Sequence, residues 1–349
     1  YTTFEILESS IRSNGMELTF TEPLTEGDGW NPKDDLVKQW YYNPTEDYGG
    51  PKMDEQELKV LSASVSGDRK KVFLEIEGIK KNHVVYVRTK NFISENLKEL
   101  RSPELWYTVN EIPKDKNGEI LPVPSGANQD NVLTEEEKNK GWKLLFDGKS
   151  IDQWRNYKKE TIGSSWVIND HAICLNSELK DDGGWQTKDG GDIISKESFE
   201  NYDLQLDWKI GPCGNSGIMI NVQEEDKYDY VWMTGPEMQV LDNSCHPDAV
   251  YKKHKAGDLY DLIESKFSTV NPAGSWNHVR IISLNGQVQF WLNGYNVANF
   301  DINGEEWKSL IEGSKFKAWP DFGTFTSGHI SLQDHVDKVW YKDIKIRNL

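Results

Sequence analysis

Carboxylate, amide and imidazole side chains gather between residues 232 and 261 of the sequence. In the segment GPEMQVLDN, the two-residue period of a β-strand places Glu237 and Gln239 on one face and Met238 and Val240 on the other. Glutamate and glutamine are uncommon in strands and in cores, so this face points to water or to a ligand. We expect Glu237 to be a catalytic acid or base and Gln239 to bind substrate; the alternative for both is a solvated strand face.

A second segment, GHISLQDH, near the end of the chain has the same alternation of polar and apolar residues. Alternation places Ser331, Gln333 and His335 on one face of a strand. An imidazole titrates near neutral pH, which suits His335 to acid–base catalysis or to metal ligation. We predict that Gln333 binds substrate beside it. The alternative for His335 is a histidine at the rim of a sheet, bonded to a loop.

The loop after the Glu237 strand supplies further candidates. His254 is a candidate catalytic residue, and Asp242, Tyr260 and Asp261 are candidate substrate contacts. Loops carried by rigid sheets are where binding side chains accumulate. The alternative for the aspartates is capping or bridging of turns, which is the commoner role of aspartate in loops.

The same loop contains a candidate set of ligands for a divalent cation. His246, Asp248 and His254 offer imidazole and carboxylate ligands, and such a cation would polarise a substrate oxygen. Their spacing lacks the i, i+4 pair of histidines that marks a metalloprotease helix. The identity of any cofactor is therefore left open.

Three other positions complete the candidate binding set. Asn215 lies in GPCGNSGI, where glycines allow close approach of the backbone to a ligand, although a turn-forming role is the alternative. Lys317 in SKFKAWPDFG would neutralise negative charge that develops on a substrate, and a solvated surface lysine is the alternative. Trp319, together with Trp185 and Trp232, offers a flat surface for stacking, whereas most tryptophans of such proteins lie in the core.

The elements that must position these residues are short strands in two domains. Residues 1–113 contain alternating stretches separated by Gly, Asn, Asp and Pro, which predicts a small antiparallel sandwich. Residues 114–137 are polar and lack periodicity, so they read as a linker that ends in a helical turn with Thr134 as N-cap and Glu137 three residues later.

Residues 138–349 contain at least nine strand-like segments and no long helical pattern. Two Asn-Gly pairs between apolar runs, in SLNGQ and LNGY, predict β-hairpins. The predicted fold class is all-β, with an N-terminal sandwich followed by a concanavalin-like jelly-roll sandwich.

Composition and charge exclude several classes of partner. The formal net charge of −17 disfavours nucleic acid and anionic membranes. No run of about 18 apolar residues occurs, so no membrane-spanning segment is expected. Because the chain begins at Tyr1 rather than Met, we expect that a signal peptide was removed and that the protein is periplasmic or extracellular.

The three cysteines match no zinc-binding pattern. Cys174, Cys213 and Cys245 all lie in the second domain, and an odd number leaves at least one thiol unpaired. We expect buried, inert thiols, and the count alone leaves the disulfide status and the redox compartment open.

From Gly141 to Leu349 the chain resembles the 3-keto-disaccharide hydrolase family. The matching segments occur in the family's order and are LLFDGKSIDQW, GDIISKESFENYDLQLDWKI, GNSGI, GPEMQVLDN, AGDLYDL, GSWNHVRI, WLNG and GHISLQDH with VWYKDIKIRNL. Asn221 departs from the pattern because the family often shows arginine there, which implies altered substrate contacts. Through QWYYNPTEDYGGP and LWYTVNEIP, the first domain resembles the immunoglobulin-like accessory modules of Bacteroidetes proteins.

The resemblance implies a concanavalin-type jelly roll that cleaves glycosides already oxidised to a ketone at C3. Such a carbohydrate substrate would come from an upstream sugar 3-dehydrogenase. The ketone acidifies the hydrogen at C2, so a base can remove it and expel the glycosidic oxygen from C1, after which water adds. Two alternatives remain: direct displacement by two carboxylates, and a lectin-like module that binds carbohydrate without cleaving it.

Overall fold

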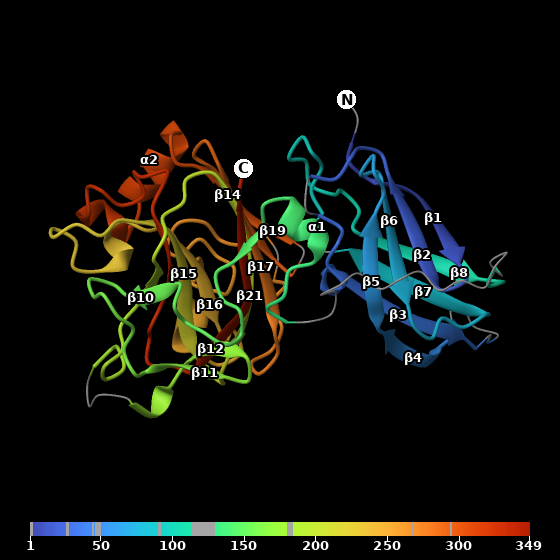
Figure 1. The fold of residues 1–349 in the computed structure, drawn as a ribbon, viewed down its shortest axis with the longest axis horizontal. Helices are drawn as coiled ribbons and strands as arrows, with labels where there is room; N and C mark the ends of the chain where they lie inside the picture. The colour runs from blue at the N-terminus through green and yellow to red at the C-terminus, as the bar shows by residue number, and fades with distance from the viewer. Residues whose placement is uncertain are drawn as a thin grey trace. The chain divides into compact units, whose positions relative to one another are not determined.

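The structure of the protein is a computed structural model. The residues that it describes are 3–25, 28–43, 45, 50–89, 92–113, 130–179, 184–266, 268–293 and 295–349. They form two compact units, Tyr1–Lys140 and Gly141–Leu349 (Figure 1). Within the described ranges, no helix has both the length and the apolar character needed to cross a membrane.

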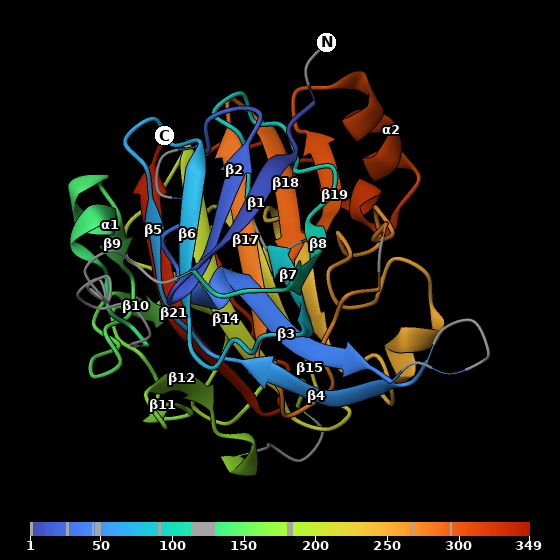
Figure 2. The ribbon, with the colours of Figure 1, turned by 90° about the vertical axis from the view of Figure 1, so that its right-hand side faces the viewer.

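The first unit consists of two four-stranded antiparallel sheets, with strand orders β1-β2-β6-β5 and β4-β3-β7-β8 (Figure 2). The strands are β1 (Ile6–Arg12), β2 (Gly15–Phe20), β3 (Asp35–Tyr42), β4 (Lys52–Leu58), β5 (Val60–Val65), β6 (Lys71–Ile76), β7 (His83–Thr89) and β8 (Glu104–Val109). Alternate residues of these strands, such as Val85 and Val87 of β7, are buried in one apolar cluster. The predicted sandwich is therefore present, and its assignment as immunoglobulin-like stays a prediction.

The predicted linker lies largely outside the described residues, because positions 114–129 are not among them. The helical turn at its end is present as α1 (Glu135–Asn139). The backbone N–H of Glu137 donates to the Thr134 hydroxyl at 3.2 Å, and the backbone N–H of Thr134 donates to the Glu137 carboxylate at 2.8 Å. This reciprocal pair confirms the predicted capping box.

The second unit is a sandwich of two antiparallel sheets, which confirms the all-β, jelly-roll prediction. A five-stranded sheet has the order β10-β13-β20-β15-β16, and an eight-stranded sheet has the order β11-β12-β21-β14-β17-β18-β19, with β9 paired to β21. The strands are β9 (Lys143–Leu144), β10 (Trp154–Asn156), β11 (Trp166–Asn169), β12 (Ala172–Leu175), β13 (Ile193–Ser195), β14 (Tyr202–Ile210), β15 (Asn215–Val222), β16 (Glu237–Leu241), β17 (Asn277–Leu284), β18 (Gln287–Leu292), β19 (Tyr295–Asp301), β20 (His329–Leu332) and β21 (Val339–Asn348).

The helical segments of the second unit are short and lie in the connections between strands. They are α2 (Glu305–Glu312) and the 3-10 turns η2 (Ser177–Leu179), η3 (Val231–Met233), η4 (Pro247–Val250) and η5 (Lys315–Ala318); the first unit has η1 (Pro32–Asp34). The Asn-Gly pair at 285–286 has positive φ at both residues and joins β17 to β18, as the sequence predicted.

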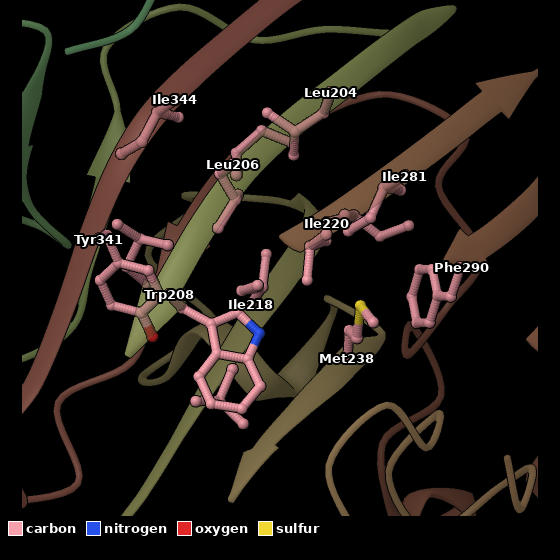
Figure 3. Close-up of a cluster of buried hydrophobic side chains, with 14 of the residues drawn as sticks. Leu204, Leu206, Trp208, Ile218, Ile220, Met238, Ile281, Phe290, Tyr341 and Ile344 are labelled. Atoms are coloured by element: carbon pink, nitrogen blue, oxygen red, sulfur yellow. The ribbon is translucent and has the colours of Figure 1, made fainter. Parts of the chain in front are cut away.

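The core of the second unit lies between its two sheets (Figure 3). Leu206 and Trp208 of β14 project into it from one sheet, and Ile218 of β15 and Met238 of β16 project from the other. Because successive strand residues point to opposite faces, Met238 in the core directs Glu237 and Gln239 to the outer face of the five-stranded sheet. The core packing therefore fixes the side on which the candidate site lies.

Candidate functional site

A pocket of about 240 Å³ lies on the outer face of the five-stranded sheet. It contains carboxyl, amide, imidazole, ammonium and aromatic groups. The described residues that line it are Trp185, Asn215, Trp232, Glu237, Gln239, Asp248, Tyr260, Lys315, Phe316, Trp319, Gln333 and His335. Seven of the eleven predicted site residues are in this set: Asn215, Glu237, Gln239, Tyr260, Trp319, Gln333 and His335.

Glu237 lies directly over Gly217 of the neighbouring strand. A Cβ atom built on Gly217 would come within 2.0 Å of Glu237 Oε1 and within 2.7 Å of its carboxyl carbon. Residue 217 therefore has to be glycine if the carboxyl group is to occupy this position. The motif GNSGI thus contributes two things to the site: the side chain of Asn215 and, at Gly217, the space that the Glu237 carboxyl group occupies.

The Glu237 carboxyl group is buried, with only 6% of the residue exposed, and it has no hydrogen-bond partner among the described residues. Burial raises its pKa from 4.5 to about 8, because desolvation penalises the charged form. The nearby ammonium of Lys315 opposes this rise, and the carboxylates of Asp192 and Asp248 add to it. At neutral pH the group is mainly a carboxylic acid that can donate a proton.

The amide groups of the pocket form a pre-set hydrogen-bonding surface. Gln239 Nε2 donates to Asn215 Oδ1 at 2.8 Å across the β15–β16 pair. The backbone N–H of Asn215 donates to the carboxylate of Asp337 at 3.1 Å. Because their mutual bond fixes both side-chain orientations, the second amide hydrogen of Gln239 and the amide of Asn215 are held ready for the hydroxyl groups of a ligand.

A disulfide joins Cys213, two residues before Asn215, to Cys245. The expectation of buried, inert thiols is therefore wrong for these two cysteines, which are exposed, and confirmed for Cys174, which is free and buried. Sequence spacing could not reveal the pairing, because the two residues meet only through the β15–β16 hairpin. The cross-link fixes the loop that enters β15 against the loop that leaves β16.

Gln333 and His335 follow the end of β20, and the backbone of Gln333 is bonded to β15. The backbone N–H of Gln333 donates to Gly217 O at 3.0 Å, and its carbonyl accepts from the Ser216 hydroxyl at 2.7 Å. Burial lowers the pKa of His335 below 6.5, with Asp337 opposing this effect and His246 adding to it. His335 Nδ1 is buried and has no partner in the described part of the chain. A neutral imidazole is thus available in the pocket.

The motif AGDLYDL lies along the free edge of β16. Gln239 exchanges two backbone bonds with it: its N–H donates to Asp258 O at 3.0 Å, and the N–H of Gly257 donates to its carbonyl at 2.9 Å. The N–H of Tyr260 donates to Glu237 O at 3.0 Å, which places the phenol beside the carboxyl group. Burial and the nearby Glu237 raise the pKa of Tyr260, so its hydroxyl stays protonated.

Lys315, and not the predicted Lys317, supplies the ammonium group of the pocket. Its Nζ lies 4.1 Å from the centre of the Tyr260 ring, and its backbone N–H donates to Asp261 Oδ2 at 3.1 Å. Lys317 is exposed and does not line the pocket. In a 3-10 turn, two residues are separated by about 240° around the axis, so both lysines of η5 cannot face the same side.

Three other predicted site residues hold loops and do not line the pocket. Asp242 accepts bonds from the backbone N–H of Cys213 at 2.8 Å and from the hydroxyl of Ser244 at 2.6 Å. Asp261 accepts from Lys315 and lies 3.3 Å from His254 Nε2, while the His254 ring packs 4.5 Å from that of Tyr260. These residues support the pocket from behind.

Asn221 is buried away from the pocket lining. Its side-chain amide donates to the backbone carbonyl of Phe325 at 2.9 Å. The expectation that this position alters substrate contacts is therefore not supported by its location. It orders a loop instead.

The predicted cation ligands do not converge. His254 Nδ1 lies 4.0 Å from Asp248 Oδ2, and His246 Nδ1 accepts from the backbone N–H of Asp248 at 3.1 Å. Among the described residues, the group of three with ligand atoms within 4.8 Å of one another is Cys213, Asp242 and Cys245, and both of its sulfur atoms belong to the disulfide. The geometry of these histidines thus gives no support for the predicted cation.

Sequence reasoning missed Asp192, Lys315 and Phe316. Lys315 and Phe316 line the pocket, and Asp192, which is not in the lining, is near enough to Glu237 to raise its pKa. Asp192 accepts the backbone N–H of Asp334 at 2.9 Å, and its burial raises its pKa to about 7. The Asp192 carboxyl group precedes a short apolar strand, a pattern too common to mark a site.

The fold and the pocket define a class: a jelly-roll protein with a pocket of carboxyl, amide, imidazole and aromatic groups on the outer face of one sheet. The comparisons with known proteins agree with that class. Residues 141–347 match the model of the family described as a 3-keto-alpha-glucoside-1,2-lyase-like domain, and the chain belongs to this family. The predicted family is thereby confirmed.

Two relatives show the extent of the similarity. A 3-keto-disaccharide hydrolase of Bacteroides thetaiotaomicron is 34% identical over 230 residues, which is 60% of this chain and 79% of the relative. The crystal structure of a "putative glycosyl hydrolase" from Parabacteroides distasonis is 35% identical, with a TM-score of 0.57, and the match covers 63% of this chain and all of that one.

Proposed function

We propose that the second unit cleaves the glycosidic bond of 3-keto-glycosides, by elimination followed by addition of water. The observation that carries the proposal is the presence, in one pocket, of a carboxyl group with a raised pKa and an imidazole with a lowered pKa. When the surroundings raise the pKa of one group and lower the pKa of another, the first group can act as an acid and the second as a base. Membership of the family and the hydrolase relatives support glycoside cleavage as the reaction class.

The protonation states give each group a role. Neutral His335 removes the hydrogen at C2, and the electron pair forms an enolate with the C3 ketone. The C1–O bond then breaks as C1=C2 forms, and protonated Glu237 gives its proton to the leaving oxygen. Water adds across the new double bond to complete a net hydrolysis.

Other pocket residues stabilise the substrate and the charge that develops on it. The ammonium of Lys315 is the cation in the lining that can lie next to the enolate oxygen. The paired amides of Asn215 and Gln239 bind hydroxyl groups. Trp319 offers an apolar ring surface to the substrate.

The test is to incubate the protein with a 3-keto-glucoside and with its unoxidised parent, and to follow release of the leaving group. We expect cleavage of the keto compound alone. The rate should rise as His335 loses its proton below pH 6.5 and fall as Glu237 loses its proton near pH 8. A rate that instead rises through pH 8 to a plateau would make Glu237 the base.

Two outcomes would overturn the proposal. Cleavage of the unoxidised parent would point to displacement by two carboxylates, for which Asp248 lines the same pocket as Glu237. Binding of both compounds without cleavage of either would point to a lectin-like module.

We also propose that the protein works in an oxidising compartment, outside the cytoplasm. The Cys213–Cys245 disulfide supports this location, because such bonds persist mainly in secreted and periplasmic proteins. The C3 ketone of the substrate requires a preceding oxidation, so a sugar 3-dehydrogenase would act upstream. Finding the reduced dithiol in protein isolated from its native host would contradict the location.

A further inference from the structure

Four aromatic side chains form a continuous surface that begins in the pocket and extends beyond it. Trp232 lies edge-on to Trp319, with ring centres 4.9 Å apart, and it stacks on Tyr230 at 5.0 Å with an angle of 7° between the planes. Tyr230 in turn meets Trp185 at 5.4 Å and 62°. We call these four residues the aromatic wall. Tyr230 is the one member outside the pocket lining.

The outer part of the wall is exposed, and the residues next to it are anchored. Trp185 is 43% and Tyr230 is 38% exposed to solvent. Trp232 packs on a small apolar cluster on the outer face of the sheet that includes Met219 and Val231. Two residues after Trp185, both the N–H and the hydroxyl of Thr187 donate to the buried carboxylate of Asp334, at 3.0 and 2.6 Å.

The register of β15 and β16 places the wall and the amides on opposite sides of Glu237. Gln239 pairs with Gly217 and bonds to Asn215 near the start of β15, whereas Glu237 pairs with Met219, farther along that strand. Trp232 belongs to η3, which follows the far end of β15. Along the strand direction, the order is therefore amides, then Glu237, then the aromatic wall.

The volume of the pocket limits what it can hold. Pockets for drug-sized ligands span roughly 300–1,000 Å³, so 240 Å³ has room for one sugar ring and little more. If the oxidised ring donates and accepts hydrogen bonds at the amides, and if its C1 oxygen lies at Glu237, the group attached to that oxygen extends toward Trp232. The surface that it meets is the aromatic wall.

We infer that the aromatic wall is a subsite for a planar aromatic leaving group, so that the enzyme accepts 3-keto-glycosides of aryl alcohols. This inference rests on the proposed function. An aryl ring can stack on Trp185 while it meets the edge of Tyr230, the geometry that aromatic pairs prefer. The paired amides, which suit the hydroxyl groups of a sugar, lie on the other side of Glu237, so this surface favours an aryl group over a second sugar.

The experiment compares methyl, cyclohexyl and phenyl 3-keto-glucosides with the wild-type protein and with Trp185→Leu and Tyr230→Leu. For the phenyl compound, KM should rise roughly three- to tenfold in each variant, the size expected for loss of one aromatic contact. For the methyl compound, KM should change less than for the phenyl compound in Trp185→Leu, and it should not change in Tyr230→Leu, which leaves the pocket lining intact. Trp106→Leu is the matched control, since Trp106 of the first unit is 60% exposed, and its kinetics should equal those of the wild type.

The outcomes separate this inference from the proposed function. Equal changes in KM for the methyl and phenyl compounds, or for the cyclohexyl and phenyl compounds, would overturn the aryl subsite while cleavage of 3-keto-glycosides stands. If the wild type cleaves none of the three, the proposed function fails. In that case, the binding of phenyl 3-keto-glucoside, measured by tryptophan fluorescence, tests the subsite alone. An affinity that is unchanged in Trp185→Leu would overturn the aryl subsite.

Discussion

Replacement of Glu237 by glutamine should make the protein more stable while it abolishes cleavage. The carboxyl group is buried without a hydrogen bond among the described residues, so the folded protein binds its proton more tightly than the unfolded chain does. Between pH 4.5 and 8 the unfolded chain has lost this proton and the folded protein still holds it. Stability therefore falls as pH rises through this window, and it stays low above pH 8.

The size of the effect follows from the two pKa values, 4.5 and about 8. At 1.36 kcal/mol for each pKa unit, the buried carboxyl group lowers the free energy of unfolding by about 1 kcal/mol at pH 5, about 3 kcal/mol at pH 7 and about 5 kcal/mol at pH 9. Glutamine has a similar shape and no charge, so the Glu237→Gln variant escapes this cost. Its advantage in free energy of unfolding should grow by about 4 kcal/mol from pH 5 to pH 9.

Thermal unfolding of both proteins across this pH range measures the difference. For a unit of this size, a change of about 4 kcal/mol in the free energy of unfolding corresponds to a Tm difference between the two proteins that widens by roughly 8–16 °C. All other titrating groups are the same in both proteins, so their contributions cancel. Parallel curves of Tm against pH would refute the reasoning, because they would show that Glu237 is ionised and solvated in the folded state.

Three further predictions concern residues that position or complete the site. Gly217→Ala should lower kcat by roughly 100-fold with little loss of stability, because its new methyl group displaces the Glu237 carboxyl group from its position; an unchanged kcat would contradict this role. Cys245→Ser should lower the free energy of unfolding by roughly 2–4 kcal/mol, measured by urea denaturation, since the bond closes a loop of 32 residues. Lys315→Met should lower kcat at least tenfold, whereas Lys317→Met, its exposed neighbour, should not; equal effects would remove Lys315 from the proposed chemistry.

The strands and the central part of the site could be predicted because they depend on short-range patterns. The period of two in GPEMQVLDN already separates Glu237 and Gln239 from Met238, and burial of Met238 in the core confirms that separation. The motifs GNSGI and GHISLQDH form strands adjacent to β16 or one strand removed from it, so their polar faces meet at one place.

The loop residues could not be assigned in this way, because their directions depend on local turns and not on a period. Asp242 and Asp261 have the same chemistry as a binding carboxylate, yet backbone N–H groups occupy their oxygen atoms. Lys315 and Lys317 are equivalent in the sequence, and only the 3-10 turn between Ser314 and Trp319 determines which one faces the pocket.

Gly217 connects the stability of the second unit to its chemistry. A glycine in the interior of a strand weakens it, and here the vacated space admits a largely buried carboxyl group that has no hydrogen-bond donor in the described chain. That environment raises the pKa of Glu237 to about 8, which is the property a proton donor needs at neutral pH. Any substitution that exposes the carboxyl group further to water, or gives it a hydrogen-bond donor, should therefore stabilise the fold and lower the pKa together, with a loss of activity at neutral pH.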